Sequence, residues 1–330
     1  MTSAPRHRGS VPSSPVRLTG RAWRYALVRA VREFLHDQVT DKAAALTYYA
    51  VLSIFPALIA LVSLLGLVGQ AEETTRATLD LLGTFLPAQV IDLLRGPIGS
   101  LAGSTGAGWG LALGVLAALW SASNYVNAFS RAANGIYEVP EGRPLWKRRA
   151  VMYGLTALLV VLVALAALLL VLSGPLARAV GDVVGLGATA LTVWSVAKWP
   201  VLVLIAVVIV ATLYDVAPNV RQPRLRWISP GAVLALLVAA VASLGFGFYV
   251  SNFSHYDATY GTLAGVVIFL LWLWIMDIAL LLGVELDVEL ERARELQSGL
   301  PAAARLHVPL RDTAKVEKDA RTRQKLIDTG

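Results

Sequence analysis

The stretch from Asp41 to Gly69, DKAAALTYYAVLSIFPALIALVSLLGLVG, most constrains how this chain can fold. Its apolar part begins at Ala43 and exceeds the ~20 residues that a helix needs to cross a bilayer. The whole sequence is 56% hydrophobic and only 15% charged, whereas soluble domains carry about 25% charged residues. The sequence therefore predicts an integral membrane protein.

Polar and small residues interrupt this first apolar stretch. Pro56 predicts a kink, because its ring removes a backbone donor and presses against the carbonyl of Leu52. Ser53 is expected to offset part of this by donating to the carbonyl of Tyr49. Tyr49, Ser53 and Pro56 fall at helical spacing, so one side of this helix carries small and polar residues. This side has two interpretations, a helix-packing face or part of a substrate path.

Six apolar segments are predicted to span the membrane, at about residues 43–69, 108–129, 150–173, 194–214, 230–250 and 262–286. Ser229 and Pro230 predict the start of the fifth, as N-cap and first helical residue. Residues 81–101 are apolar but broken by Gly and Pro. Short amphipathic helices at the outer interface are expected there, with a further span left open. The predicted fold class is all-α: a polytopic membrane protein with a six-helix transmembrane bundle.

The segments outside these spans have their own patterns. Residues 1–20 are rich in Pro, Ser, Gly and Arg, which predicts a disordered tail. Residues 21–38 place arginines among apolar residues at helical spacing, which predicts an N-terminal amphipathic helix on the anionic inner leaflet. A nucleic-acid arm is the alternative, disfavoured because an apolar face needs a lipid or protein partner. Residues 296–330 form a charged, Ala-rich cytoplasmic tail, expected to be loosely ordered.

Charge predicts the topology. With six spans and both termini inside, the inner segments hold 25 of the 29 Lys and Arg residues. This asymmetry follows the positive-inside rule and places both termini in the cytoplasm. It also accounts for the net charge of +7 without nucleic acid. Membrane lipids of the inner leaflet are the expected partners, and a homo-oligomer stays open.

Motifs for catalysis, cofactors and metals are not found. The four histidines are scattered, the chain has no cysteine, and no metalloprotease, phosphate-loop or nucleophile-elbow motif occurs. One acidic run, GVELDVELERARE, could attract a divalent cation. Its alternating acids point in different directions on a helix, so a cage would need other partners. We expect instead that this run forms the hydrated end of the sixth helix and pairs with Arg292 and Arg294.

Asp277 is the clearest candidate functional residue, because an acid within a span is costly. The alternative is an acid that is hydrogen-bonded to a Ser or Asn of a neighbouring helix. Pairing with Asn124 or Asn127 of the second span would make a polar route through the inner half, with Glu285 nearer the inner end. The full set of candidate pathway or helix-packing residues is Tyr49, Ser53, Pro56, Asn124, Asn127, Asp277 and Glu285.

Several blocks resemble the YihY/BrkB family of bacterial inner-membrane proteins. They are KAAALTYYAVLSIFPALI, LWSASNYVNAFSRAANGIY, LYDVAPN, SPGAV and YGTLAGVVIFLLWLWIMDIALLLGVELDVELER, in the expected order. The resemblance implies six transmembrane helices in the cytoplasmic membrane. Members of the family were long labelled as a tRNA-processing ribonuclease, and one branch as a serum-resistance factor. Asp277 departs from the family pattern, in which this place is usually small or polar.

Three functions are weighed from the sequence. The first is a transporter or translocase of lipid-like or other small solutes, not driven by ATP because no nucleotide-binding motif is present. The second is a non-transporting scaffold for envelope assembly. The third, a membrane-associated ribonuclease, fits worst because the sequence offers no soluble domain and no clustered His and Asp set for a metal-dependent nuclease.

Overall fold

The computed structural model describes residues 18–66, 79–80, 91–92, 95–96, 107–171, 188–221, 229–252, 262–303 and 305–329. Regular structure in these residues is helical, apart from one isolated antiparallel bridge between Val220 and Leu310. The principal helices are α1 (Gly20–His36), α2 (Val39–Gly66), α5 (Ala107–Ile136), α6 (Leu145–Val171), α8 (Ala188–Val216), α9 (Pro230–Asn252), α11 (Thr262–Gln297) and α12 (Ala314–Thr329).

Four of the helices contain segments that are long and apolar enough to cross a membrane. These segments are Leu145–Ala166 of α6, Thr192–Val216 of α8, Pro230–Tyr249 of α9 and Gly265–Gln297 of α11. The other two long helices, α2 and α5, overlap the first two segments that the sequence predicts as spans. The predicted region 81–101 lies almost entirely outside the described residues.

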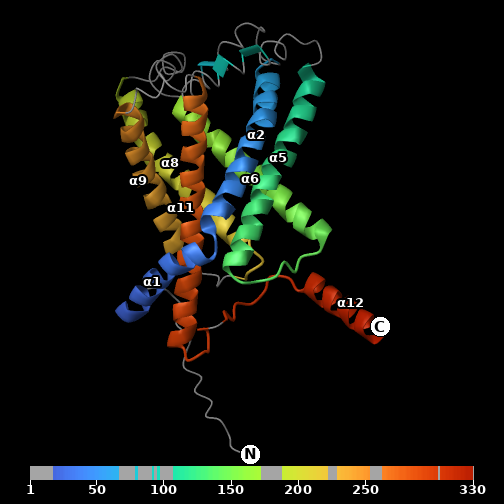
Figure 1. Ribbon diagram of the computed structural model, residues 1–330. Coiled ribbons are helices and arrows are strands. Elements are labelled where there is room, and N and C mark those ends of the chain that lie inside the picture. Colours follow the sequence, from blue (N-terminus) through green and yellow to red (C-terminus); the bar gives the residue numbers. More distant parts are fainter. Residues whose placement is uncertain are drawn as a thin grey trace, which may run out of the picture.

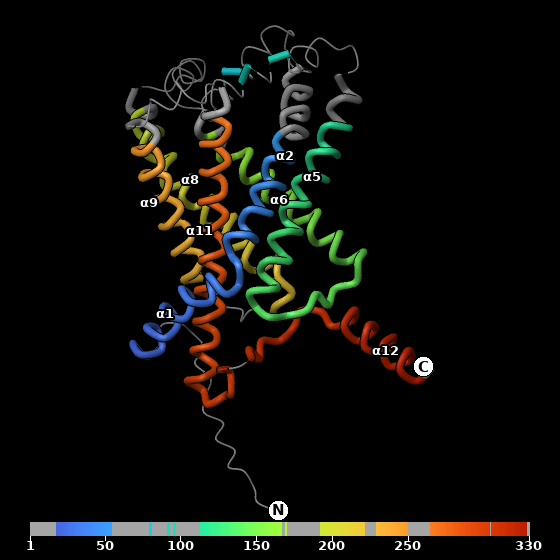
Figure 2. Tube along the Cα trace, viewed as in Figure 1, coloured from blue at the N-terminus to red at the C-terminus, as the bar shows by residue number. Residues whose placement is uncertain are grey.

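Two pairs of long helices are closely packed: α2 lies along α5, and α9 lies along α11. α11 also contacts α1, α2 and α5, so it joins the two pairs. Figure 1 shows α1 and α12 at one end of the bundle, which we call the α1 end; the other is the far end. α2 and α5 diverge from α9 and α11 toward the far end (Figures 1 and 2).

Burial along α11 follows the same trend. From Asp277 to Glu295 most residues are buried, whereas no residue from Gly265 to Met276 is fully buried. The main apolar core lies at the α1 end as well, with Leu46 of α2 and Phe129 of α5 among its fully buried members. The residues of α11 are therefore mostly buried toward the α1 end and partly exposed beyond Asp277.

The boundaries of α9 and α1 follow local sequence signals. α9 begins at Pro230, and the Ser229 hydroxyl accepts from the backbone N–H of Ala232 at 3.0 Å, which confirms the predicted cap. Thr19 caps α1 by accepting from the N–H of Ala22, and Leu18 is buried. Residues 18–20 therefore belong to the folded part and not to a tail; residues 1–17 lie outside the described residues.

The C-terminal segment is ordered, contrary to the expectation of a loose tail. Its anchor is Asn219, a fully buried residue after α8. The Asn219 side chain accepts from the N–H of Asp312 at 3.1 Å and donates to the carbonyls of Asp312 and Pro140. Residues 306–313 are thereby held across the α1 end, and α12 projects from them (Figure 1). The sequence did not predict this order, because residues 306–313 are extended and held by partners far away in the sequence. Such a segment shows no periodic spacing of apolar residues.

Candidate functional site

Asp277 lies where the packing of α11 changes, and it joins three helices. Its side chain is 4% exposed. One carboxylate oxygen accepts from the hydroxyl of Thr47 on α2 at 2.9 Å, and the other from the hydroxyl of Tyr125 on α5 at 2.8 Å. Both oxygens thus have partners, which a buried carboxylate needs in an apolar surrounding. Asp277 is therefore hydrogen-bonded to two neighbouring helices, through the hydroxyls of Thr47 and Tyr125 and not through the Ser or Asn that the sequence suggested.

The amides predicted to pair with Asp277 do not supply these bonds. Asn127 is half-buried and donates to the carbonyl of Ser123 in its own helix at 2.7 Å. Asn124, one residue before Tyr125, is also half-buried. The polar group around Asp277 is made by hydroxyls and not by amides. The periodicity of α5 pointed to the right stretch but to the wrong residues in it.

The predicted residues of α2 have separate surroundings. Ser53 donates to the carbonyl of Tyr49 at 2.7 Å, which confirms that prediction. Tyr49 is partly buried and packs against the main core, with its ring edge-on to that of Tyr48. α2 continues through Pro56 to Gly66, and the side chain of Pro56 lies outside the described residues. Of these residues, Tyr49 packs against the core, whereas Thr47 makes the contact with Asp277.

The acidic run at the end of α11 is buried, which corrects the expectation that it is hydrated. Glu285, Asp287, Glu289, Glu291 and Glu295 are each at most 7% exposed. The predicted pairing holds for two of them: Arg292 bonds Glu289 at 3.0 Å, and Arg294 bonds Glu291. The run is buried because α1 packs across this part of α11. The sequence placed it at the membrane boundary without a covering helix.

Each acid of this run meets a different neighbour. Asp287 accepts from the backbone N–H of Gly231 at the N-terminus of α9, at 2.9 Å. A carboxylate at a helix N-terminus pairs with the positive end of the helix dipole. Glu289 lies 3.2 Å from Arg29 of α1. Arg292 reaches Glu138 in the connection between α5 and α6 at 2.8 Å. This part of α11 therefore ties together α1, α9 and that connection.

Glu285 and Glu289 are each 1% exposed. The Oε2 atom of each makes no hydrogen bond in the part of the chain that the structure describes, although Arg29 lies 3.2 Å from that of Glu289. The charged groups whose fields act on Glu285 are Asp37, Glu289, Lys42 and Glu33, of which only Lys42 is positive. A buried carboxylate among like charges is costly unless something compensates it.

A second buried charge joins the α5–α6 connection to the end of α8. Arg143 is 1% exposed and donates to both carboxylate oxygens of Glu141, at 2.8 and 2.7 Å. It also donates to the carbonyl of Ala217, which follows α8, at 2.8 Å. Burial opposes ionisation of Glu141, but its bonds to Arg143 outweigh burial and hold its pKa below the ordinary value of 4.5. Arg143 and Glu141 were not among the candidate residues predicted from the sequence.

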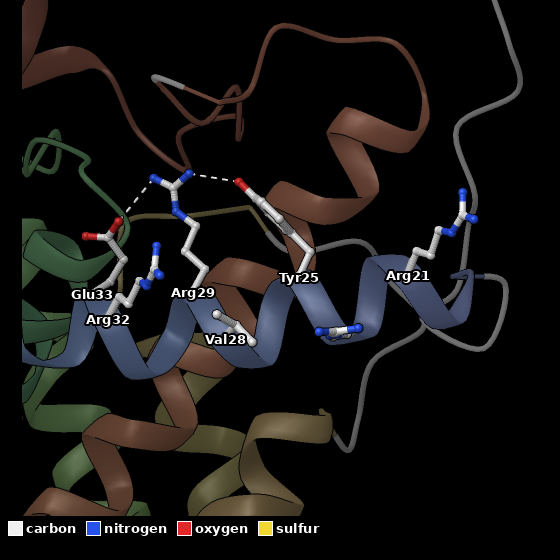
Figure 3. A pocket seen from close by; sticks show the side chains of 7 residues that line it. Arg21, Tyr25, Val28, Arg29, Arg32 and Glu33 are labelled. Atoms are coloured by element: carbon white, nitrogen blue, oxygen red, sulfur yellow. Dashed lines mark hydrogen bonds and ion pairs between the residues drawn. The ribbon is translucent and has the colours of Figure 1, made fainter.

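A shallow groove of about 620 Å³ runs along the outer face of α1. Figure 3 shows the arginines that line it, with Arg29 donating to the Tyr25 hydroxyl and paired with Glu33. The opposite, small-residue face of α1 packs Ala26 and Ala30 on α11. Four large apolar side chains of α1 are exposed: Leu27, Val28, Val31 and Leu35. α1 thus presents a basic face and an apolar face away from the bundle.

The long helices are apolar and expose Leu, Val and Trp, while the buried ionic groups of the described residues lie inside the bundle and at its α1 end. These features define a multi-pass helical membrane protein. Residues 30–307 match the virulence factor BrkB family, and the chain belongs to that family.

Curated relatives agree with this assignment. The chain is 33% identical over 270 residues to a protein of Bacillus subtilis (strain 168) named as ribonuclease-like protein YfkH, which covers 82% of this chain and 96% of that relative. It is 28% identical over 261 residues to a UPF0761 membrane protein of Xanthomonas campestris, covering 77% of this chain. A UPF0761 membrane protein of Alkalilimnicola ehrlichii is 32% identical over 261 residues, or 76% of this chain. The chain spans 58% and 55% of these two longer relatives. No solved structure matches it.

Proposed function

We propose that this protein is a transporter or translocase of lipid-like or other small amphipathic solutes in the bacterial cytoplasmic membrane. The single observation that carries the proposal is the position of Asp277. This buried acid lies at the level where α11 passes from full burial to partial exposure. A polar group at the base of a partly exposed apolar stretch suits a solute with a polar head and an apolar body.

The partly exposed stretch extends from Gly265 to Met276, which is about 18 Å along the axis of α11. The described side chains of this stretch are mostly apolar and include Leu270, Leu271 and Trp272. Such side chains suit acyl chains better than ions, because they offer few hydrogen-bond partners. The tightly packed α1 end would form the closed side of this conformation.

The membrane topology is part of the same proposal. We place six spans at α2, α5, α6, α8, α9 and α11, with both termini in the cytoplasm. The charge asymmetry of the connecting segments supports this orientation. The arginines and exposed apolar residues of α1 suit the anionic inner leaflet. The sequence carries no nucleotide-binding motif, so transport would follow a gradient.

The test is translocation of a fluorescent phospholipid in vesicles that contain anionic lipid and the purified chain. The wild type is expected to move labelled lipid from the inner to the outer leaflet, where an external quencher removes its fluorescence. The fluorescence of the inner-leaflet label should therefore decay faster. Asp277→Asn should lower the rate at least tenfold, and Thr47→Val and Tyr125→Phe should each lower it less. Asn127→Leu should have a smaller effect than Asp277→Asn, since its amide is bonded within α5. Asp319→Asn, an exposed acid on α12, is the matched control.

A non-transporting scaffold is the second candidate, and α12 favours it. This helix projects from the bundle, and its side chains include the exposed Leu326 and Ile327 (Figure 1). A stable copurifying protein that is lost on deleting residues 314–330, together with wild-type vesicles that show no flux, would replace transport by this role. For the ribonuclease activity suggested by the name of the Bacillus relative, we expect no RNA cleavage by the purified chain.

A further inference from the structure

The groove on the outer face of α1 has an excess of positive charge. Four of the seven residues that line it are arginines, and Glu33 is the one acid among them. Glu33 is already paired with Arg29 at 3.2 Å, and Arg29 also lies 3.2 Å from the buried Glu289 of α11. Within the part of the chain that the structure describes, no ion pair with an acid is formed by the other three arginines, Arg21, Arg24 and Arg32.

The helix holds these arginines close to one another. Arg21 and Arg24 are three residues apart, as are Arg29 and Arg32, so each pair occupies neighbouring positions on the surface of α1. Like charges at such positions repel and destabilise the helix. An anion bound in the groove would offset this repulsion, and arginine binds phosphate groups through two parallel hydrogen bonds.

Exposed apolar side chains border the arginines. Val28 lines the groove itself, and Arg24 and Arg32 lie about one helical turn on either side of it (Figure 3). Val31 and Leu35 continue from Val28 at helical spacing and are 65% and 74% exposed. α11 does not cover this apolar stripe, because α1 packs its small residues on α11 instead.

Arginines beside an uncovered apolar stripe suit a phospholipid better than a free phosphate or a nucleic acid. The guanidinium groups can bind the phosphate of the headgroup, and the stripe can contact an acyl chain. A free phosphate or a nucleic acid would leave the stripe in contact with water. The volume of the groove, about 620 Å³, lies within the range of roughly 300–1,000 Å³ that is usual for small-molecule sites.

The position of α1 also favours a ligand from the bilayer. A short turn at Asp37 and Gln38 joins α1 to α2, and α1 lies at one end of the bundle (Figure 1). In the topology proposed above, this end faces the cytoplasm. The groove would then lie at the level of the headgroups of the inner leaflet, where anionic lipids attract basic segments.

We propose that the groove of α1 binds one anionic phospholipid. Its headgroup phosphate lies between Arg24 and Arg32, and an acyl chain lies along Val28, Val31 and Leu35. This inference rests on the topology in the proposed function and not on transport. It differs from a general attraction to an anionic surface, because it specifies one lipid per chain and the side chains that hold it.

The test counts the lipids bound to the purified full chain in a non-ionic detergent by native mass spectrometry. Phosphatidylglycerol and phosphatidylcholine with the same acyl chains are compared. We expect one phosphatidylglycerol per chain, bound at least tenfold more tightly than phosphatidylcholine. Arg24→Gln combined with Arg32→Gln should abolish this preference. Arg321→Gln combined with Arg323→Gln, which removes the same charge from exposed positions of α12, should retain it.

A second pair of substitutions distinguishes a lipid from other phosphates. Val31→Ser combined with Leu35→Ser should weaken the binding of phosphatidylglycerol at least threefold, although every arginine is retained. Inorganic phosphate and a single-stranded RNA oligomer are added as competitors, and neither should displace the lipid at an equal concentration. Displacement by the RNA, with no effect of the two serine substitutions, would assign the groove to nucleic acid and overturn the proposal.

The substituted side chains of α1 are exposed, so gel filtration and the melting temperature without lipid should match the wild type. Equal binding of the two lipids by the wild type would also overturn the proposal, as would a preference that survives in the Arg24 and Arg32 variant or is lost in the α12 control. Asp277→Asn, which tests transport, should bind phosphatidylglycerol as the wild type does, so the failure of one proposal is distinguishable from the failure of the other.

Discussion

The same substitution at two positions of α9 is predicted to have opposite effects on stability. Gly231 lies at the crossing of α9 and α11. A Cβ atom added to it would overlap the carbonyl oxygen of Gly283 and lie 2.6 Å from Cγ of Asp287, whereas ordinary contact begins at 3.4 Å. At Gly245, two thirds of the way along the same helix, an added Cβ would have nothing within 4 Å.

The magnitude follows from these contacts. Gly231→Ala forces the helices apart, and overpacking of this kind costs about 1–3 kcal/mol. It also displaces Asp287 and breaks the bond from the Gly231 N–H to this carboxylate; a hydrogen bond to a charged group contributes about 1.5–3 kcal/mol. We expect a total loss of about 3–5 kcal/mol, discounting partial relaxation. Gly245→Ala should gain about 0.5–1 kcal/mol, because glycine inside a helix costs that much relative to alanine.

Equilibrium unfolding in sodium dodecyl sulfate, followed by the fluorescence of the nine tryptophans, measures both variants against the wild type. Gly283→Ala should behave like Gly231→Ala, since its Cβ would overlap the carbonyl of Gly231 and the hydroxyl of Tyr214. If Gly231→Ala and Gly245→Ala shift the midpoint in the same direction, the close crossing of α9 and α11 at these glycines would be refuted.

Two further predictions concern the α1 end. The pKa of Glu141 is lowered from 4.5 in the folded chain. Its stabilising effect is therefore complete above about pH 4.5 and is lost as the pH falls through the lower folded pKa. Melting temperatures measured between pH 6 and pH 3 should show this loss in the wild type and not in Glu141→Gln. Asn219→Ala leaves the N–H of Asp312 and two carbonyls without partners, each at a cost of about 1–3 kcal/mol. Hydrogen exchange of residues 306–313 should therefore accelerate. Unchanged exchange would show that other contacts hold these residues.

Local patterns in the sequence were sufficient for the long apolar helices, but not for α12 or for the partners of each helix. The bond from Ser53 to Tyr49 and the cap at Ser229 lie within four residues of their partners, so the sequence alone predicts them. Thr47 and Asp277 are 230 residues apart. Such a pair depends on which helices pack together and on how each is rotated about its axis. The spacing of apolar residues within one segment predicts neither.

The acidic run of α11 shows why this difference matters. Alternating acids on one helix point in different directions, which argued against a metal cage built from the run alone. The same geometry lets α11 send Asp287 to the N-terminus of α9 and Glu289 to Arg29 of α1. A helix with all of its acids on one face could join one neighbour only. Because each acid has a different neighbour, an apolar substitution in this run should disturb the contact of one helix at a time, whereas loss of α1 would expose Glu285 and Glu289 together.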